Sequence, residues 1–252
     1  MILSHMHNFL FIKGKKVGGT SVEIALASHC GPGDVITPIT PIDEFKRLGP
    51  DGSLGGGARN YTNVPKLESR YRAQVFESKG RLSEIPWWLE SVQQFYNHMS
   101  YEEVLRNYGA PLTGYLVFTV ERHPYDKALS LAAMRVSFES YKHGGNMDAP
   151  AEEVHIQLEK LLDSGEIRNI RNFDRYSING KPVAQVLRQE RLDEELITLA
   201  SRLGISGHLS VPRAKCTNTD RSVINRDILT RRQKQVIQVL CREEFEVFGY
   251  DK

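Results

Sequence analysis

Short apolar runs followed by polar loops divide the chain into alternating strands and helices. Residues 9–12 predict a buried strand, and the apolar positions within residues 22–27 predict a helix that ends before Gly31. Every position of residues 115–120 is apolar, β-branched or aromatic, so this run predicts a central strand that is covered on both faces. The alternation predicts an α/β fold with a central parallel β-sheet flanked by α-helices.

Helix-capping signals place further helices along the chain. Two pairs of residues have the spacing of a capping box, namely Ser100 with Glu103 and Thr230 with Gln233. They predict one helix that ends by residue 109 and a last helix that ends at residue 249. The remaining pattern predicts helices over residues 126–141, 150–164 and 192–203 and a strand over residues 181–187.

Residues 31–70 carry the weakest pattern of the chain. Five glycines fall within residues 49–57, and such a segment cannot bury enough apolar surface to order itself. We therefore expect a flexible insertion around residues 45–66. The length of 252 residues fits one α/β domain, so we expect this insertion to lie inside a single domain that spans residues 1–252.

Composition narrows the class of protein. Lys and Arg number 33 against 31 Asp and Glu, and this balance gives no reason to expect a nucleic-acid-coating protein. The three cysteines include no C-x-x-C pair, which argues against a disulfide framework and a cysteine metal site. Because the sequence has no 18-residue apolar run and no secretory signal, we expect a cytoplasmic protein without a membrane span.

The chemistry of an anion site is concentrated in the loop after the first predicted strand. Lys13, Lys15 and Lys16 precede Gly18-Gly19-Thr20-Ser21, which opens the first predicted helix. Glycines allow close approach of the backbone to a phosphate, and the unpaired N–H groups and dipole of a helix N-terminus favour an anion. The alternative is a solvated turn that only caps the helix. The coincidence of strand, glycine loop and helix favours phosphate binding.

The loop lacks the lysine that follows the last glycine in a Walker A sequence. Its lysine-first order resembles the 5′-phosphosulfate loop of the sulfotransferases, approximately P-K-[TS]-G-[GT]-[TS]-[ST]. The family's proline position holds Lys15, and its first hydroxyl position holds Val17. The matching residues are Lys16, Gly18, Gly19, Thr20 and Ser21.

A second segment resembles the sulfotransferase element that holds the 3′-phosphate of the donor, f-x-V-R-x-P-[YFW]-x-R-x-x-S. Arg122 lies at the end of the predicted central strand, where ligands bind in open α/β sheets, and Ser130 follows eight residues later. Lys127 stands in place of the family's second arginine. Taken alone, Arg122 could be a surface ion pair with Asp126, and Ser130 a helix residue bonded to its own backbone.

Residues 186–196 and 243–250 resemble two further segments of the carbohydrate-type sulfotransferases, so mainly residues 31–95 lie outside the resemblance. It implies a single P-loop-like domain that moves a sulfuryl group from 3′-phosphoadenylyl sulfate (PAPS) to a hydroxyl or amine. The implied acceptor is a carbohydrate or glycoconjugate, and no metal is expected. The implied donor-binding residues are Lys15, Lys16, Val17, Gly18, Gly19, Thr20, Ser21, Arg122 and Ser130.

In-line transfer needs stabilisation of the leaving phosphate and a base for the acceptor proton. We assign the first role to Lys16. His98 resembles a histidine before a helix in the carbohydrate branch and is the first candidate base, although an ordinary cap histidine is an equal alternative. His123 and Glu23 are weaker candidates.

A basic stretch, residues 213–234, begins where the family covers the nucleotide, so Arg213 and Lys215 are further candidates for contact with PAPS or an anionic acceptor. Two other functions are weighed against sulfuryl transfer: a P-loop kinase that uses ATP and Mg²⁺, and a non-catalytic anion-binding module. The identity of the acceptor and the oligomeric state are not readable from the sequence.

Overall fold

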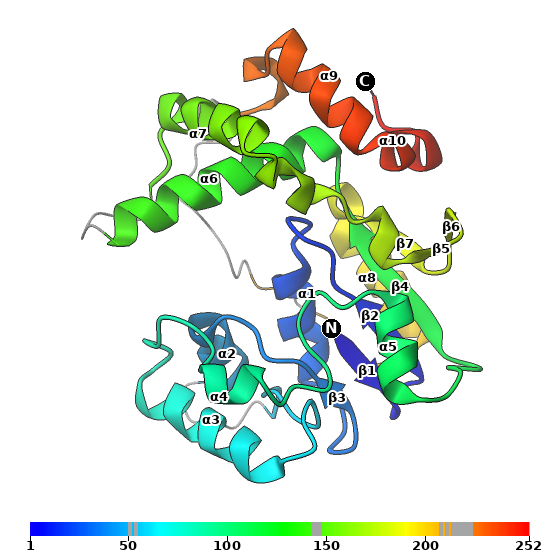
Figure 1. Cartoon of the computed structure of the whole chain (residues 1–252). Helices are drawn as coiled ribbons and strands as arrows, with labels where there is room; N and C mark the ends of the chain where they lie inside the picture. The colour runs from blue at the N-terminus through cyan, green and yellow to red at the C-terminus, as the bar shows by residue number, and fades with distance from the viewer. Residues whose placement is uncertain are drawn as a thin grey trace. The chain divides into compact units, whose positions relative to one another are not determined.

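The computed structural model describes residues 1–49, 52, 55–142, 148–206, 209, 212 and 224–251. These residues form a mixed α/β fold (Figure 1). The strands are β1 (Ile2–Ser4), β2 (Phe9–Ile12), β3 (Val35–Ile36), β4 (Leu116–Glu121), β5 (Ser177–Ile178), β6 (Lys181–Pro182) and β7 (Gln185–Arg188). The helices are α1 (Gly19–Ala27), α2 (Pro41–Leu48), α3 (Pro65–Glu77), α4 (Trp87–Glu90), α5 (Tyr101–Tyr108), α6 (Pro124–Lys142), α7 (Ala151–Asp163), α8 (Leu192–Arg202), α9 (Arg231–Leu240) and α10 (Arg242–Phe248). Short 3₁₀ turns η1 (Glu166–Ile170), η2 (Phe173–Arg175), η3 (Gln189–Arg191) and η4 (Arg226–Ile228) connect some of them.

The central sheet has the strand order β3-β1-β2-β4-β7. β2 and β4 pair in parallel, as expected from the two strongest apolar runs, and Phe11 lies opposite Phe118. The sheet is mixed and not purely parallel, because β1 pairs antiparallel with both β2 and β3. β1 and β2 are joined by a turn of only four residues, which is too short for the crossover that a parallel pair needs.

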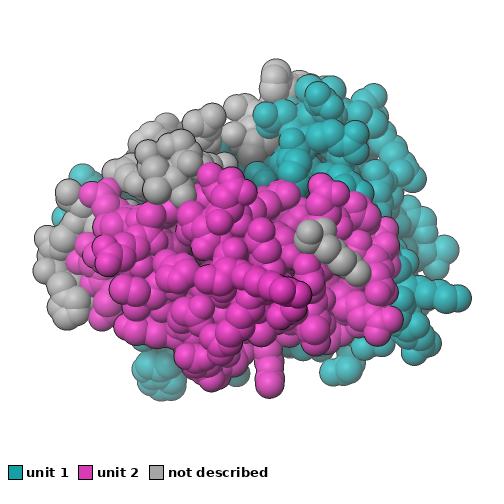
Figure 2. Space-filling view, turned by 90° about the horizontal axis from the view of Figure 1, so that it is seen from above, with its two compact units in different colours: residues 1–14, 18–120, 175–214 teal, residues 15–17, 121–174, 215–252 magenta. Residues whose placement is uncertain are grey.

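The chain divides into two compact units (Figure 2). Unit 1 comprises residues 1–14, 18–120 and 175–214 and contains the sheet, and in it α2, α3 and α4 pack together (Figure 1). Unit 2 comprises residues 15–17, 121–174 and 215–252, and its core lies among α6, α7, α9 and α10. The single domain over residues 1–252 stays a prediction.

Both capping boxes are formed. The side chain of Ser100 accepts the Glu103 N–H and that of Thr230 accepts the Gln233 N–H, while Glu103 and Gln233 bind back to the capping residues. The last predicted helix is divided at Cys241 into α9 and α10. The predicted strand over residues 181–187 is also divided, because β6 forms a separate hairpin with β5 across Asn179-Gly180, both at positive φ.

The segment expected to be a flexible insertion, residues 45–66, is partly helix. Its first residues belong to α2, and residues 50, 51, 53 and 54 lie outside the described residues. After them, Arg59 donates hydrogen bonds to the carbonyls of Gly31, Cys30, Gly55 and Gly57. The flexibility of residues 45–66 stays a prediction. Among the described helices, none is long and apolar enough to cross a membrane.

Candidate functional site

The glycine loop begins at a buried lysine. Lys13 directly follows β2, is only 4% exposed, and its Nζ donates to Glu23 Oε2 at 2.6 Å. A Cβ atom at Gly19 would lie 2.8 Å from Lys13 Cγ, so the packing of this lysine requires glycine there. Lys13 thus ties the end of β2 to α1, and its role is to hold the loop's starting point.

The N-terminus of α1 is open to an anion. Gly18, the capping residue, has φ +80°, a conformation that favours glycine, and no side chain caps the helix in the described residues. The Gly18 carbonyl accepts the Ser21 N–H at 3.0 Å. Thr20 is buried and Ser21 half-buried in the first turn. The N-cap residue therefore offers no side chain to the start of α1, where backbone N–H groups can donate to an anionic ligand.

Residues 15–17 are held from within unit 2. Asn172 clamps the Lys15 backbone from both sides, because its Oδ1 accepts the Lys15 N–H at 2.7 Å and its Nδ2 donates to the Lys15 carbonyl at 3.0 Å. The Lys15 ammonium donates to Asn169 at 2.8 Å. Lys16 has φ +64°, and Val17 is buried. No sequence pattern pointed to Asn172, which lies 157 residues from Lys15.

His98 lies in unit 1 with its ring at the end of β2. Its Nδ1 contacts the carbonyl oxygen of Lys13 at 3.1 Å, so Nδ1 carries the proton and Nε2 keeps its lone pair. Burial, with the Lys13 charge adding to it, lowers the pKa of His98 to about 2. The imidazole is therefore neutral at physiological pH, and Arg175 fixes the residue further by donating to the His98 carbonyl.

Glu23 is poorly suited to act as a base. It is fully buried, with the Met1 ammonium at 2.6 Å from one carboxylate oxygen and Lys13 Nζ at 2.6 Å from the other. Burial alone would raise the pKa of Glu23, but these two cations outweigh it and hold the pKa well below its usual range. A carboxylate with such a low pKa has little affinity for a substrate proton.

The end of β4 carries the second predicted motif. Arg122 is 17% exposed, and its Nε lies 4.0 Å from Asp126 Oδ2, which is the ion pair weighed as its alternative role. Arg226 binds the same carboxylate in bidentate fashion at 3.0 and 2.7 Å. Two arginines thus share one carboxylate. Ser130 is half-buried on α6.

Lys127, which stands in place of the family's second arginine, is part of the interior of unit 2. Its Nζ lies 2.8 Å from Glu121 and 3.1 Å from Glu244, and all three side chains are fully buried. Burial alone would lower the pKa of Lys127, but the two carboxylates raise it above its usual value. Glu244 also accepts the Asn172 N–H at 2.8 Å, so this ion-pair network supports the clamp on the Lys15 backbone.

His123 packs inside unit 2 against the rings of Tyr125, Phe245 and Tyr250, with Nε2 at 3.0 Å from the Asp251 carbonyl. These contacts and its 2% exposure fit a structural role. Arg213 and Lys215 lie outside the described residues. No group of three or more His, Cys, Asp or Glu side chains that could hold a metal ion occurs in the described ranges.

No protein-family model matches the chain, and no curated protein or solved structure matches it either. The function must therefore be argued from the geometry of the site itself.

Proposed function

We propose that the protein is a sulfotransferase of P-loop-like fold that moves a sulfuryl group from PAPS to a hydroxyl or amine of an acceptor, for which we propose a carbohydrate or glycoconjugate. The observation that carries the proposal is the start of α1. There Lys16 and Gly18 adopt positive φ after strand β2, and no side chain caps the helix in the part of the chain that the structure describes. This arrangement suits the 5′-phosphate of the donor.

The order of the strands supports a second phosphate contact. β2 and β4 are parallel neighbours, so their carboxyl ends lie at the same edge of the sheet. The lysine-glycine loop follows β2, and Arg122 follows β4, at the edge where open α/β sheets bind ligands. Arg122, together with Ser130 on α6, is our choice for the 3′-phosphate.

Lys16 and His98 take the two catalytic roles. Bound PAPS would supply the sulfuryl group, whose bond to the 5′-phosphate oxygen breaks as the acceptor oxygen bonds to sulfur. The Lys16 ammonium balances the charge that develops on the departing phosphate. His98 accepts the acceptor's proton at Nε2, because Nδ1 already donates to the Lys13 carbonyl.

The pKa of His98 matters for this role. A pKa of about 2 keeps the ring unprotonated, but it also makes the free ring a weak base. The positive charge of Lys13 contributes to this low pKa. A dianionic phosphate bound near Lys13 would offset that charge and raise the pKa of His98 toward the working range. We therefore expect the base strength of His98 to depend on the presence of the donor nucleotide.

Thermal unfolding with candidate nucleotides tests the proposal. Adenosine 3′,5′-bisphosphate, the desulfonated product of PAPS, should raise the Tm without added metal, because a ligand that binds the native state stabilises it. Stabilisation by ATP with Mg²⁺ and none by the bisphosphate would favour the kinase instead. Lys66→Ala, at an exposed lysine in unit 1, serves as the charge control and should respond like the wild type.

Substitution of His98 separates catalysis from binding. His98→Gln should abolish turnover of PAPS with an active acceptor, while the bisphosphate still binds with its wild-type affinity. The check is single-turnover transfer measured beside calorimetric binding. Full activity of the variant would remove His98 from the mechanism.

A further inference from the structure

α2, α3 and the segment between them enclose polar side chains that lack partners. Arg47, Tyr61 and Tyr71 are each at most 1% exposed. The Nε and Nη1 atoms of Arg47 and both tyrosine hydroxyls form no hydrogen bond with the described residues. We call these three residues the arginine–tyrosine cluster. Buried donors are rarely left without an acceptor in folded proteins. Several such donors in one place therefore indicate a bound group that supplies acceptors.

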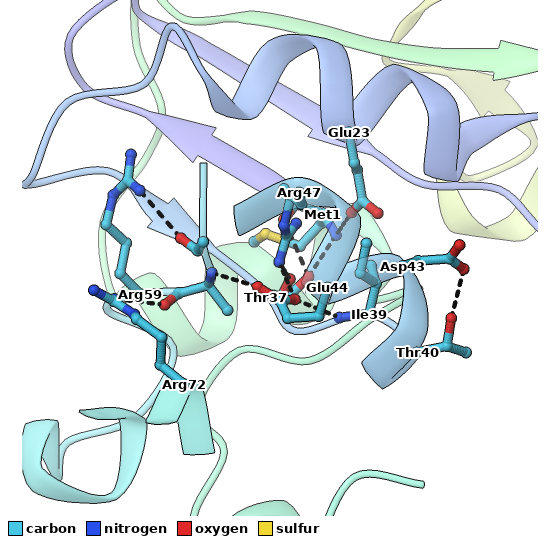
Figure 3. A network of polar contacts seen from close by, with 12 residues as sticks. Met1, Glu23, Thr37, Ile39, Thr40, Asp43, Glu44, Arg47, Arg59 and Arg72 are labelled. Atoms are coloured by element: carbon cyan, nitrogen blue, oxygen red, sulfur yellow. Dashed lines mark hydrogen bonds and ion pairs between the residues drawn. The ribbon is translucent and has the colours of Figure 1, made fainter. Parts of the chain in front are cut away.

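The rest of the Arg47 guanidinium is already used. Its Nη2 donates to the Thr37 carbonyl at 3.0 Å and to the Glu44 carboxylate (Figure 3). Glu44 is occupied in turn, since it accepts the N–H groups of Ala58 at 2.8 Å and Ile39 at 3.3 Å. Three N–H bonds of Arg47, on Nε and Nη1, therefore still face the interior without an acceptor among the described residues.

The two tyrosines lie close to this arginine. Tyr71 is on α3, which packs against α2, the helix that carries Arg47. Burial raises the pKa of Tyr71, and the Glu44 and Arg47 charges act on the same hydroxyl. Burial also raises the pKa of Tyr61, and Glu68, Glu44 and Tyr71 add to this effect. Both hydroxyls therefore stay protonated and can donate.

Two further arginines border the cluster. Arg72 donates to the Ala58 carbonyl at 3.0 Å, and Arg59 donates to carbonyls of the surrounding loops (Figure 3). Neither has a carboxylate within 4.0 Å in the described ranges, whereas Arg47 is paired with Glu44. Burial lowers the pKa of Arg59, and the nearby Arg72 and Arg47 charges also act to lower it. The carboxylates of Glu44 and Glu68 act on the Tyr61 hydroxyl and that of Asp34 acts on Arg59, so the surroundings of the cluster carry charges of both signs.

We infer that the arginine–tyrosine cluster is a binding site for an oxyanion, a carboxylate or a sulfate group. Such a group offers only acceptors and a negative charge, which match the unpartnered N–H donors and hydroxyls of the cluster. Arg72 is exposed, Arg59 half-buried and Arg47 buried, so the positive charge extends from the surface inward.

The inference also specifies the acceptor, and this part rests on the proposed function. If the protein transfers sulfuryl groups, a carboxylate or sulfate on the acceptor would anchor it in unit 1. The acceptor class would then be an acidic sugar and not a neutral one. The oxyanion site itself does not depend on the reaction and can be tested without PAPS.

Calorimetric titration at constant ionic strength tests the site. The probes are sodium sulfate, sodium glucuronate and glucose, each against a sodium chloride reference. We expect sulfate or glucuronate to bind and glucose not to bind. Binding of sulfate alone would identify a free oxyanion as the ligand, and binding of glucuronate would identify an acidic sugar. Binding of neither, or equal binding of glucose, would overturn the inference.

Paired variants locate the binding. Arg47→Met leaves Glu44 buried without its partner and can fail to fold, so the main variant is Tyr61→Phe with Tyr71→Phe, which removes two donors and keeps both rings. We expect it to bind the oxyanion about tenfold more weakly, as the loss of one charge-assisted hydrogen bond would produce. Tyr101→Phe is the control. Unchanged oxyanion affinity in the double variant would overturn the site.

Two readouts keep this test separate from the proposed function. Adenosine 3′,5′-bisphosphate should bind the double variant as it binds the wild type, so a failure of either proposal shows in its own titration. A crystal grown in sodium selenate should show anomalous density within hydrogen-bond distance of Arg47 Nη1. Water alone at that position would contradict the inference.

Discussion

The loops that follow β2 and β4 both start from a buried ion-pair network, but the two networks have opposite composition. After β2, one carboxylate, Glu23, lies between the Lys13 ammonium and the Met1 amino group, whose pKa burial lowers to about 6. After β4, one cation, Lys127, lies between the carboxylates of Glu121 and Glu244. In both, the ion pair fixes the end of a strand to the helix that follows it, which gives the functional loop a rigid origin.

The two networks differ in the further contacts that their groups make. The surplus carboxylate in unit 2 accepts backbone N–H groups, including that of Asn172, whose side chain clamps Lys15. In unit 1 the Met1 amino group donates to Thr37 Oγ1 at 2.7 Å, and both it and Lys13 act to lower the pKa of His98. Unit 2 therefore uses its network to hold the loop backbone, whereas in unit 1 burial keeps the candidate base neutral and the Lys13 charge adds to that effect.

The largest effect should come from Lys127. Lys127→Met leaves two buried carboxylates without a cation, and we expect a loss of roughly 3–5 kcal/mol in the free energy of unfolding. Chemical denaturation measures it. The matched control is Lys160→Met, at an exposed lysine of α7, which should change stability by less than about 0.5 kcal/mol. A loss of similar size in both variants would contradict a specific role for Lys127.

Glu23 should come next. Glu23→Gln removes the charge but keeps a hydrogen-bonding side chain beside Lys13, so we expect a smaller loss of about 2–3 kcal/mol. The same denaturation experiment gives the value. If Glu23→Gln is more destabilising than Lys127→Met, the network after β2 is the stronger of the two, contrary to this comparison.

The two networks should also differ in their response to pH. The pKa of Glu23 is lowered in the folded protein, so its stabilisation is present above the ordinary pKa of 4.5 and is lost as the pH falls further. The pKa of Lys127 is raised, so its stabilisation is lost as the pH rises above the ordinary value of 10.5. Glu23→Gln should flatten the acid side of the stability profile, and Lys127→Met the alkaline side.

The smallest of these effects should follow the loss of the loop clamp. Asn172→Ala removes two hydrogen bonds to the Lys15 backbone, and we expect about 1–2 kcal/mol of destabilisation. Binding of the bisphosphate should weaken as well, because the loop would lose its fixed geometry. Calorimetry checks this, with Asn107→Ala as a control amide in unit 1. Unaltered bisphosphate affinity would show that the clamp is irrelevant to binding.

The elements around the proposed site were predictable because their signals are local. The apolar runs of β2 and β4 are contiguous, and the capping boxes of α5 and α9 depend on residues three positions apart. β1 and β3 are too short to have a pattern of their own and are held by pairing in the sheet. The hairpin of β5 and β6 could have been predicted from Asn179-Gly180, but residues 181–187 were predicted as one continuous strand.

The roles of individual charged residues were less predictable, because their partners are distant in the sequence. Lys127 fits a motif position by spacing, yet its partner Glu244 lies 117 residues away and makes it structural. Lys13 shares its loop with Lys15 and Lys16, and its buried ion pair with Glu23 could not be predicted from the loop sequence. Local sequence predicts an anion-binding loop, while the fold decides which partners each of its lysines has.

We propose that the loop after β2, with Lys16, and Arg122 after β4 bind the two phosphate ends of one nucleotide. Calorimetric titration of adenosine 3′,5′-bisphosphate into the wild type, Lys16→Ala and Arg122→Ala tests it most directly. Arg231→Ala, at an exposed arginine of α9, is the control. We expect each site variant to bind at least about tenfold more weakly, the loss expected for one charge-assisted contact. Wild-type affinity in both site variants would contradict the account.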